Sequence, residues 1–275
     1  MIKKIFNKKD LDNILTDLRY YENFQNNFLE RPYKKIDFGK RIGTKEFKSL
    51  FDAADQYTYS NQVSEKNFKE WNKILNNEQS TNEELFCTVL EIFNWGKVLN
   101  GNVKIALQLY KKKKLKPYIK QIIKHLKRKE ILINDLTVKS ETNDKIDIIW
   151  SSGWTKVYSF INNDILIYDS RVSAFLNHTL TYKAEYTDEQ LVTLKKLTKF
   201  LFNFKGAENR ERLVAKHFGF KNRNPNGIDG LNANLISSWI VELLKEKLNL
   251  NQDIRSFERA FFMLGFDLKQ TKQGQ

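Results

Sequence analysis

A lysine and an aspartate near the middle of the chain have the residue types and the spacing of a reactive pair. Lys156 follows the Gly-centred turn of residues 151–153, and Asp169 comes 13 residues later, after a short apolar segment. An amine is a nucleophile, and a carboxylate stabilises developing positive charge or orients an attacking group. In a chain with a net charge of +14, this pair indicates chemistry on an acidic polymer.

The excess of basic residues favours a polyanionic partner. The chain has 47 Lys and Arg against 33 Asp and Glu. Such a field attracts phosphates, and neutralising phosphates releases condensed counterions. Double-stranded DNA is therefore the expected partner. The alternative is that the basicity is incidental and follows from a proteome rich in Lys and Asn.

Many of the basic residues gather between Gly101 and Glu130. Apolar residues recur there at helical spacing, which predicts an amphipathic helical stretch with its lysines toward solvent and Pro117 near its beginning. Contact with phosphates and plain solvation both explain such a face. The candidate DNA-binding residues on it are Lys120, Lys124 and Lys127.

Helical periodicity also dominates the rest of the chain, and evidence for strands is weak. Helices are predicted over residues 9–28, 45–54, 64–75, 82–99, 189–204, 232–247 and 254–264. The predicted fold is mainly α, one compact unit of residues 1–275 with two lobes. Residues 1–135 form the N-terminal helical lobe, a polar connector covers 135–144, and 136–275 hold the reactive pair and the C-terminal helices.

Several kinds of protein and site are excluded by the sequence. No apolar run approaches the about 18 residues of a membrane span, and the start of the chain is not a signal segment, so a cytoplasmic protein is expected. Cys87 is the only cysteine and is expected to be a small core residue. The three histidines are far apart, so no metal site is predicted.

The order of residues around the pair resembles the helix-hairpin-helix DNA glycosylases. In that superfamily a Gly-rich hairpin precedes a helix that carries the lysine of the bifunctional members, and an aspartate follows at the start of a later helix. Thr155-Lys156-Val157 and Tyr168-Asp169 stand at these two places. The hairpin here has one glycine where the family usually has two, and the lysine-to-aspartate spacing is shorter. Residues 163–172 are also similar to prokaryotic glycosylases implicated in defence against phages with modified bases.

The resemblance implies a helix-hairpin-helix element and excision of a damaged or modified base by cleavage of an N-glycosidic bond. Asp169 is then expected to stabilise the oxocarbenium-like transition state. Lys156 is the candidate nucleophile for a Schiff base, with an accompanying AP-lyase activity. No cofactor is needed, a monomer is expected, and base-excision repair and antiviral defence are both compatible roles.

The resemblance and the local sequence also name residues that bind DNA. The hairpin residues Ser151, Ser152, Gly153, Trp154 and Thr155 are expected to offer backbone N–H groups to phosphates. Arg171, Arg210 and Arg212 are further candidate DNA contacts, and the aromatic walls that a flipped base requires are expected from Tyr158 and Tyr168.

Two other interpretations stay open. The chain is alternatively a non-enzymatic helix-hairpin-helix protein that binds DNA through the same hairpin, or a globular interaction protein whose charge is incidental. Lys156 is then an exposed helix lysine, and Asp169 only caps a helix and pairs with Arg171.

Overall fold

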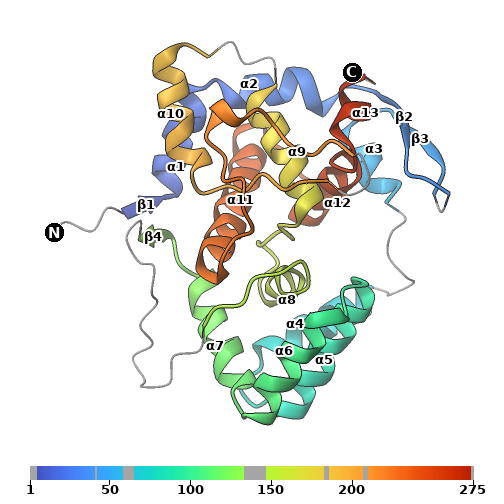
Figure 1. Cartoon of the computed structure of the whole chain (residues 1–275), viewed down its shortest axis with the longest axis vertical. Helices are drawn as coiled ribbons and strands as arrows, with labels where there is room; N and C mark the ends of the chain where they lie inside the picture. Colours follow the sequence, from blue (N-terminus) through green and yellow to red (C-terminus); the bar gives the residue numbers. More distant parts are fainter. Residues whose placement is uncertain are drawn as a thin grey trace. The chain divides into compact units, whose positions relative to one another are not determined.

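The fold is mainly helical, as the periodicity predicts. The computed structural model describes residues 5–40, 42–57, 65–132, 147–182, 186–206 and 210–273 (Figure 1). The chain divides into two compact units. Unit 1 comprises Met1–Ile5, Tyr59–Ile167 and Pro225–Leu235, and unit 2 comprises Phe6–Thr58, Tyr168–Asn224 and Ile236–Gln275. Each unit is therefore built from separate segments, a different grouping from a division near residue 135. The predicted connector at 135–144 lies outside the described residues.

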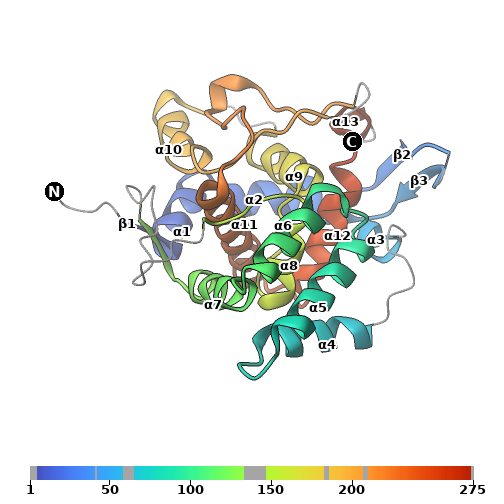
Figure 2. The ribbon, with the colours of Figure 1, turned by 60° about the horizontal axis from the view of Figure 1, so that its bottom comes forward.

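Unit 1 is built around helix α5. Its elements are α4 (Glu65–Asn76), α5 (Asn82–Trp95), α6 (Asn100–Lys111), α7 (Leu115–Leu126), strand β4 (Glu130–Leu132) and α8 (Trp154–Ile161). Helix α5 packs against α4, α6, α7 and α8 (Figure 2). Leu85, Val89 and Ile92 form its buried stripe at helical spacing.

The ends of these helices follow local signals. A capping box of Thr81 and Glu84 starts α5 at the predicted place, and the helix ends before Gly96 rather than at residue 99. The predicted stretch between Gly101 and Glu130 is two helices. Lys113 adopts a left-handed conformation with φ of 54°, and the helical conformation is interrupted there.

The residues directly before α8 are not helical. Residues 147–150 form no helix, so the turn at 151–153 does not follow a helix end there. Side chains satisfy this backbone instead: the Ile149 N–H donates to the Tyr118 hydroxyl at 3.1 Å, and the Tyr158 hydroxyl donates to the Ile149 carbonyl. The non-helical conformation is stable because these buried backbone groups have partners.

Two glycines allow the same segment to lie close to helix α11 (Gly227–Lys247). A Cβ atom at Gly227 would overlap the Ile148 carbonyl, and one at Gly230 would overlap the Trp150 ring. Helix α11 begins in unit 1 and continues in unit 2.

Unit 2 packs its helices around α12. Its elements are α1 (Lys8–Asp17), α2 (Tyr20–Phe24), the π-helix Gln25–Leu29, β2 (Tyr33–Asp37), β3 (Thr44–Phe47), α3 (Leu50–Asp55), α9 (Ser170–Thr181), α10 (Asp188–Thr198), the 3₁₀ turn Lys216–Phe218, α12 (Ile254–Leu264) and α13 (Leu268–Gln273), while β1 (Ile5–Asn7) begins at the unit boundary. Helix α12 packs against α3 and α9. The Phe261 ring lies 6.4 Å from that of Phe24 and 5.2 Å from that of Phe175, so aromatic side chains join three parts of the unit.

Unit 2 also departs from the predicted helices. The helix predicted at 9–28 is interrupted at Arg19, whose φ is 51°. Residues 44–47 form a strand that pairs antiparallel with β2, with Tyr33 opposite Phe47 and Asp37 opposite Thr44. The predicted helix at 45–54 is therefore wrong in its first half. The pairing depends on a long-range partner, which helical periodicity does not detect.

The structure corrects the expectation for Cys87. The thiol is exposed, because Cys87 lies off the buried stripe of α5, and it is not the small core residue that its apolar neighbours suggested. Among the described residues, no helix has the length and apolar character to span a bilayer.

His125 on α7 makes the stability of unit 1 sensitive to acid. Burial, and next the charge of Arg128, lower the pKa of His125 to about 4, against about 6.5 in an unfolded chain. The imidazole is neutral in both states above pH 6.5, and below that only the unfolded chain readily takes the proton. We expect the free energy of unfolding to fall by about 3 kcal/mol between pH 6.5 and 4 from this group alone.

Urea unfolding of wild type and His125→Gln across this pH range checks the effect. Gln keeps a donor for Asn232, which lies 3.3 Å from the His125 Nε2 atom. The variant should lose less stability in acid, and parallel pH profiles would contradict the expectation.

Candidate functional site

Lys156 lies in the interior of unit 1. Its side chain is 7% exposed, and it is the only lysine in the buried class among the described residues. The Nζ atom donates to the Ser152 carbonyl at 2.9 Å. The aliphatic part of the side chain runs past the end of α5, where a Cβ atom on Gly96 would come within 2.7 Å of the Lys156 Cε. The alternative of an exposed helix lysine is therefore wrong.

The turn before α8 is closed by its own side chains. The Ser151 hydroxyl accepts from the N–H groups of Gly153 and Trp154 at 3.2 and 3.1 Å, and it donates to the Asn102 side chain at 2.6 Å. These two N–H groups were expected to contact phosphates, but the structure gives them an internal partner. Among the predicted hairpin residues only Ser152 is exposed.

A second polar contact fixes α8 from the inside of unit 1. Thr155 is fully buried and its hydroxyl donates to the side chain of Asn234 on α11. The Asn234 amide donates in turn to the Leu166 carbonyl at 2.7 Å. Thr155 is thus a packing residue of this unit and has no exposed surface for DNA.

The predicted base-pocket residues are core residues. Tyr158 in unit 1 and Tyr168 in unit 2 are each 0% exposed, so neither ring offers a surface to a base in this structure. The Tyr158 hydroxyl lies 2.6 Å from that of Tyr118, and the Tyr168 hydroxyl accepts from the Phe202 N–H at 3.0 Å. Burial raises the pKa of Tyr168 to about 12, so it is a neutral phenol at physiological pH.

Asp169 caps helix α9 in unit 2, as its sequence position predicted. Its Oδ1 atom accepts from the N–H groups of Arg171 and Val172 at 2.9 and 3.1 Å, and the residue is 7% exposed. Its charge acts on Tyr57. Burial is the largest cause that raises the pKa of the Tyr57 phenol, and the carboxylates of Glu258 and Asp169 raise it further. Lys156 and Asp169 belong to different units, and the surroundings of each are those of its own unit.

Three arginines meet around Phe266 in unit 2, and we call Arg171, Arg210 and Arg212 the arginine cluster. The guanidinium carbons of Arg171 and Arg210 lie 4.8 and 4.1 Å from the centre of the Phe266 ring. Arg212 donates from Nε to the Phe266 carbonyl at 3.2 Å. Its Nη1 donates at 2.8 Å to the hydroxyl of Ser170, the first residue of α9.

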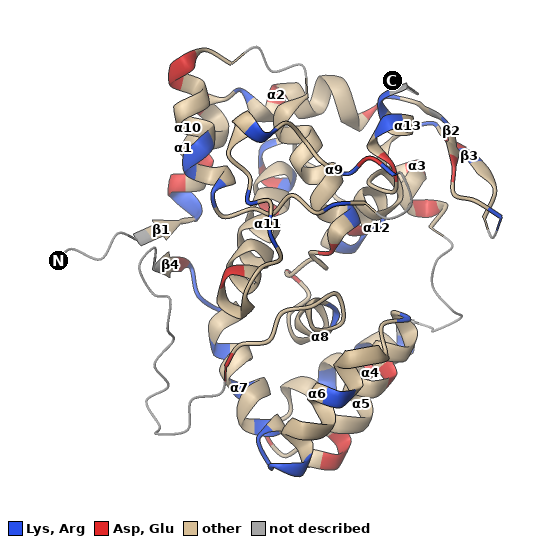
Figure 3. Ribbon diagram, viewed as in Figure 1, with Lys and Arg blue, Asp and Glu red and all other residues tan. Residues whose placement is uncertain are grey.

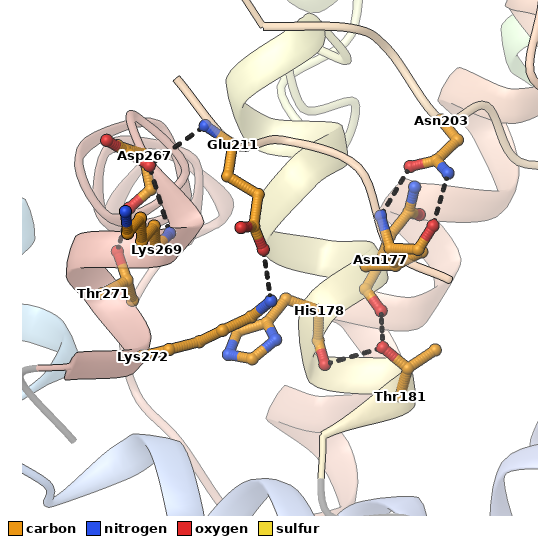
Figure 4. A network of polar contacts seen from close by, with 10 residues as sticks. Asn177, His178, Thr181, Asn203, Glu211, Asp267, Lys269, Thr271 and Lys272 are labelled. Carbon is orange, nitrogen blue, oxygen red and sulfur yellow. Dashed lines mark hydrogen bonds and ion pairs between the residues drawn. The ribbon is translucent and has the colours of Figure 1, made fainter. Parts of the chain in front are cut away.

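The segment that carries two of these arginines is tied to helix α13. The Glu211 N–H donates to Asp267 at 3.1 Å, and the Leu268 N–H donates to the Glu211 carbonyl at 2.7 Å (Figure 4). The Glu211 carboxylate pairs with Lys272 at 2.6 Å. These contacts on the residue between Arg210 and Arg212 fix the backbone from which both side chains extend.

The cluster concentrates positive charge. Burial, and next the charge of Arg171, lower the pKa of Arg212, with a further lowering from Arg210. The carboxylates of Asp169 and Asp267 act in the opposite direction. All three arginines were predicted as DNA contacts, but their proximity to one another was not, because Arg171 and Arg210 are separated by almost 40 positions and no local signal links them.

The lysines of α7 form an exposed basic face on unit 1. Lys120, Lys124 and Lys127 are exposed at helical spacing, opposite the buried stripe of the helix. The segment 92–129 contains 12 Lys and Arg and no Asp or Glu. Figure 3 shows the basic residues of α6 and α7 in this part of the chain. No carboxylate within the segment offsets its attraction for polyanions.

Within the described ranges, no three His, Cys, Asp or Glu side chains gather in a way that would hold a metal ion. No family model matches the chain, and neither the curated proteins nor the solved structures gave a match to it.

Two substitutions at Asp169 distinguish its role as a helix cap from any role of its charge. Asn retains an acceptor oxygen at the N-cap and Ala does not, while both substitutions remove the charge. We expect Asp169→Ala to have a free energy of unfolding about 1 kcal/mol below that of Asp169→Asn. Chemical denaturation of the two variants measures the difference. Equal stabilities would show that the cap contributes little.

Proposed function

We propose that this protein is a DNA glycosylase that removes a damaged or modified base from double-stranded DNA. In this proposal Lys156 and Asp169 carry the chemistry. The turn at 151–153 and helix α8 position Lys156 in this proposal. The reaction takes place in the cytoplasm, and repair and defence against phages are its two candidate roles.

The observation that carries the proposal is the burial of Lys156. Keeping an ammonium group in a protein interior costs free energy, so a lysine that is not needed there is normally exposed. No other lysine whose side chain the structure describes is buried. A buried amine whose Nζ atom donates to the Ser152 carbonyl is suited to nucleophilic attack when a proton acceptor is present.

The proposed reaction makes use of both groups. The Lys156 amine attacks C1′ of the target nucleotide, the bond from C1′ to the base breaks, and the base departs with the electron pair and takes up a proton. The attached amine then gives up a proton, the bond from C1′ to the ring oxygen breaks, the ring oxygen takes up a proton, and a Schiff base forms between C1′ and Nζ. The Asp169 carboxylate stabilises the positive charge that builds on the sugar. A hydrolytic variant, in which water attacks and Lys156 only holds the substrate, uses the same carboxylate.

A second candidate function is DNA binding without catalysis. The basic face of α7 favours it, because this face attracts phosphates whether or not Lys156 reacts. The two functions differ in their dependence on Asp169, which caps a helix in one case and also acts on the sugar in the other.

Base release distinguishes the two functions. Duplex DNA that is unmodified, oxidised, alkylated or isolated from phages with hypermodified bases is incubated with wild type, Asp169→Asn and Lys156→Gln, and free bases are measured by mass spectrometry. We expect wild type to release one base and Asp169→Asn to release at least 100-fold less, roughly the 3 kcal/mol of a lost electrostatic contact.

DNA affinity is measured in parallel as the control, and we expect both variants to retain it. Borohydride trapping identifies the nucleophile: a covalent adduct with wild type that is lost in Lys156→Gln assigns the Schiff base to this lysine. If wild type binds duplex DNA and releases no base from any of these substrates, the non-catalytic function replaces the proposal.

Gly96 offers a test that leaves both reactive groups in place. A Cβ atom there would overlap the flexible end of Lys156, which must move, and the fold should tolerate the change because only a side-chain end is displaced. We expect Gly96→Ala to reduce borohydride trapping with little loss of DNA affinity. Gly101→Ala is the matched control, since a Cβ atom at Gly101 meets nothing within 4 Å. Equal trapping in both variants would show that the position of the lysine is not critical.

A further inference from the structure

We infer that Asn102, the third residue of helix α6, is a positioning residue for the amine of Lys156. Its side chain joins the turn at 151–153 to the segment between α5 and α6, and the Lys156 side chain contacts both of these segments. The inference deepens the proposed function, and its consequence for base removal rests on that function. The contacts that carry it lie within unit 1.

The two ends of the Asn102 amide bind different segments. The Oδ1 atom accepts from the Ser151 hydroxyl at 2.6 Å, and the Nδ2 atom donates to the Val98 carbonyl at 2.6 Å. A carbonyl only accepts, so the contact with Val98 needs the N–H end of the amide. A Cβ atom on Gly153 would come within 2.6 Å of the Asn102 Nδ2, so the glycine allows the amide to lie against the turn.

Ser151 transmits the contact to the backbone of the turn. Its hydroxyl donates to Asn102, and its oxygen accepts from the N–H groups of Gly153 and Trp154 at 3.2 and 3.1 Å. Ser152 lies between these bonded residues, and its carbonyl accepts from the Lys156 Nζ at 2.9 Å. The place of that carbonyl, and with it that of the amine, therefore depends on a side chain of α6.

The segment between α5 and α6 lies beside the stem of the same lysine. A Cβ atom on Gly96 would overlap the aliphatic part of Lys156. Lys97 is left-handed with a φ of 52°, and the Val98 N–H donates back to the Phe93 carbonyl at 2.9 Å, which holds the segment to the end of α5. Through its bond to Val98, Asn102 therefore links the wall beside the stem to the carbonyl at its tip.

Trace acetylation of lysines by acetic anhydride, measured at each lysine by mass spectrometry, tests the position of the amine without DNA. The exposed Lys120 of α7 is the internal reference. Wild type is compared with Asn102→Ala, Ser151→Ala and the double variant. Asn72→Ala is the matched control, because the Asn72 amide donates at 2.8 Å to the Phe160 carbonyl near the other end of α8.

We expect Asn102→Ala to raise the acetylation rate of Lys156 relative to Lys120 by about five- to tenfold, which corresponds to about 1 to 1.4 kcal/mol for one buried hydrogen bond. Ser151→Ala should act in the same direction. The double variant should show less than the product of the two single effects, because both substitutions break one chain of contacts. Asn72→Ala should leave the rate at the wild-type value.

Ser151→Thr provides a rescue that loss of packing alone would not give. Threonine keeps the hydroxyl, so the Lys156 rate should stay near that of wild type, whereas Ser151→Ala should raise it. If Asn102→Ala does not fold, this pair of variants tests the same link from the side of the turn. An unchanged rate in Asn102→Ala, single effects that multiply in the double variant, or equal rates in the two Ser151 variants would overturn the inference.

Borohydride trapping on duplex DNA with the same proteins separates the inference from the proposed function. We expect Asn102→Ala to reduce trapping, and Asn72→Ala to retain it. If wild type forms no adduct and releases no base while the acetylation results are as expected, the proposed function fails and the inference stands. If trapping depends on Lys156 but acetylation is the same in wild type and Asn102→Ala, the proposed function stands and the inference is overturned.

Discussion

Helices α8 and α9 are buried along nearly their whole length, so their polar groups must find partners inside the protein. In unit 1, Thr155 bonds to Asn234, and the Ser159 hydroxyl donates to the Lys156 carbonyl. In unit 2, the Phe202 carbonyl accepts from the side chains of Ser173 and Asn177. These partners come from the helix itself or from segments far away in the chain. The polar groups of the two helices therefore constrain the segments that pack against them.

The same requirement explains the irregular chain before α8. The turn residues use Ser151 to satisfy two N–H groups, and Tyr118 and Tyr158 satisfy Ile149 from the side. The Lys156 Nζ atom can then donate to the Ser152 carbonyl of the turn. A consequence is that the N–H groups of Gly153 and Trp154 are not offered to a phosphate. Exposed positive charge in unit 1 is found instead on α7 and just beyond its end, at Lys120, Lys124 and Lys127.

Local signals were enough to predict much of the helical structure. Helix α5 starts at the predicted residue, Asp169 is a helix cap as predicted, and α12 has the predicted bounds, because a cap and an apolar stripe are encoded in adjacent residues. The hairpin of β2 and β3 was missed, since the strand at 44–47 is stabilised by pairing with residues 33–37 rather than by its own periodicity. Cys87 was misplaced because an apolar run does not by itself show which face of a helix is buried.

The sequence by itself determined the charge of this protein, its mainly helical class, and the cap that Asp169 forms, since composition and neighbouring residues control these properties. Only the tertiary structure decided that Lys156 is buried, that Tyr158 and Tyr168 are core residues, and that three arginines gather on Phe266. These properties depend on contacts between residues tens of positions apart. Burial and electrostatic field are set by such neighbours, which no local pattern specifies.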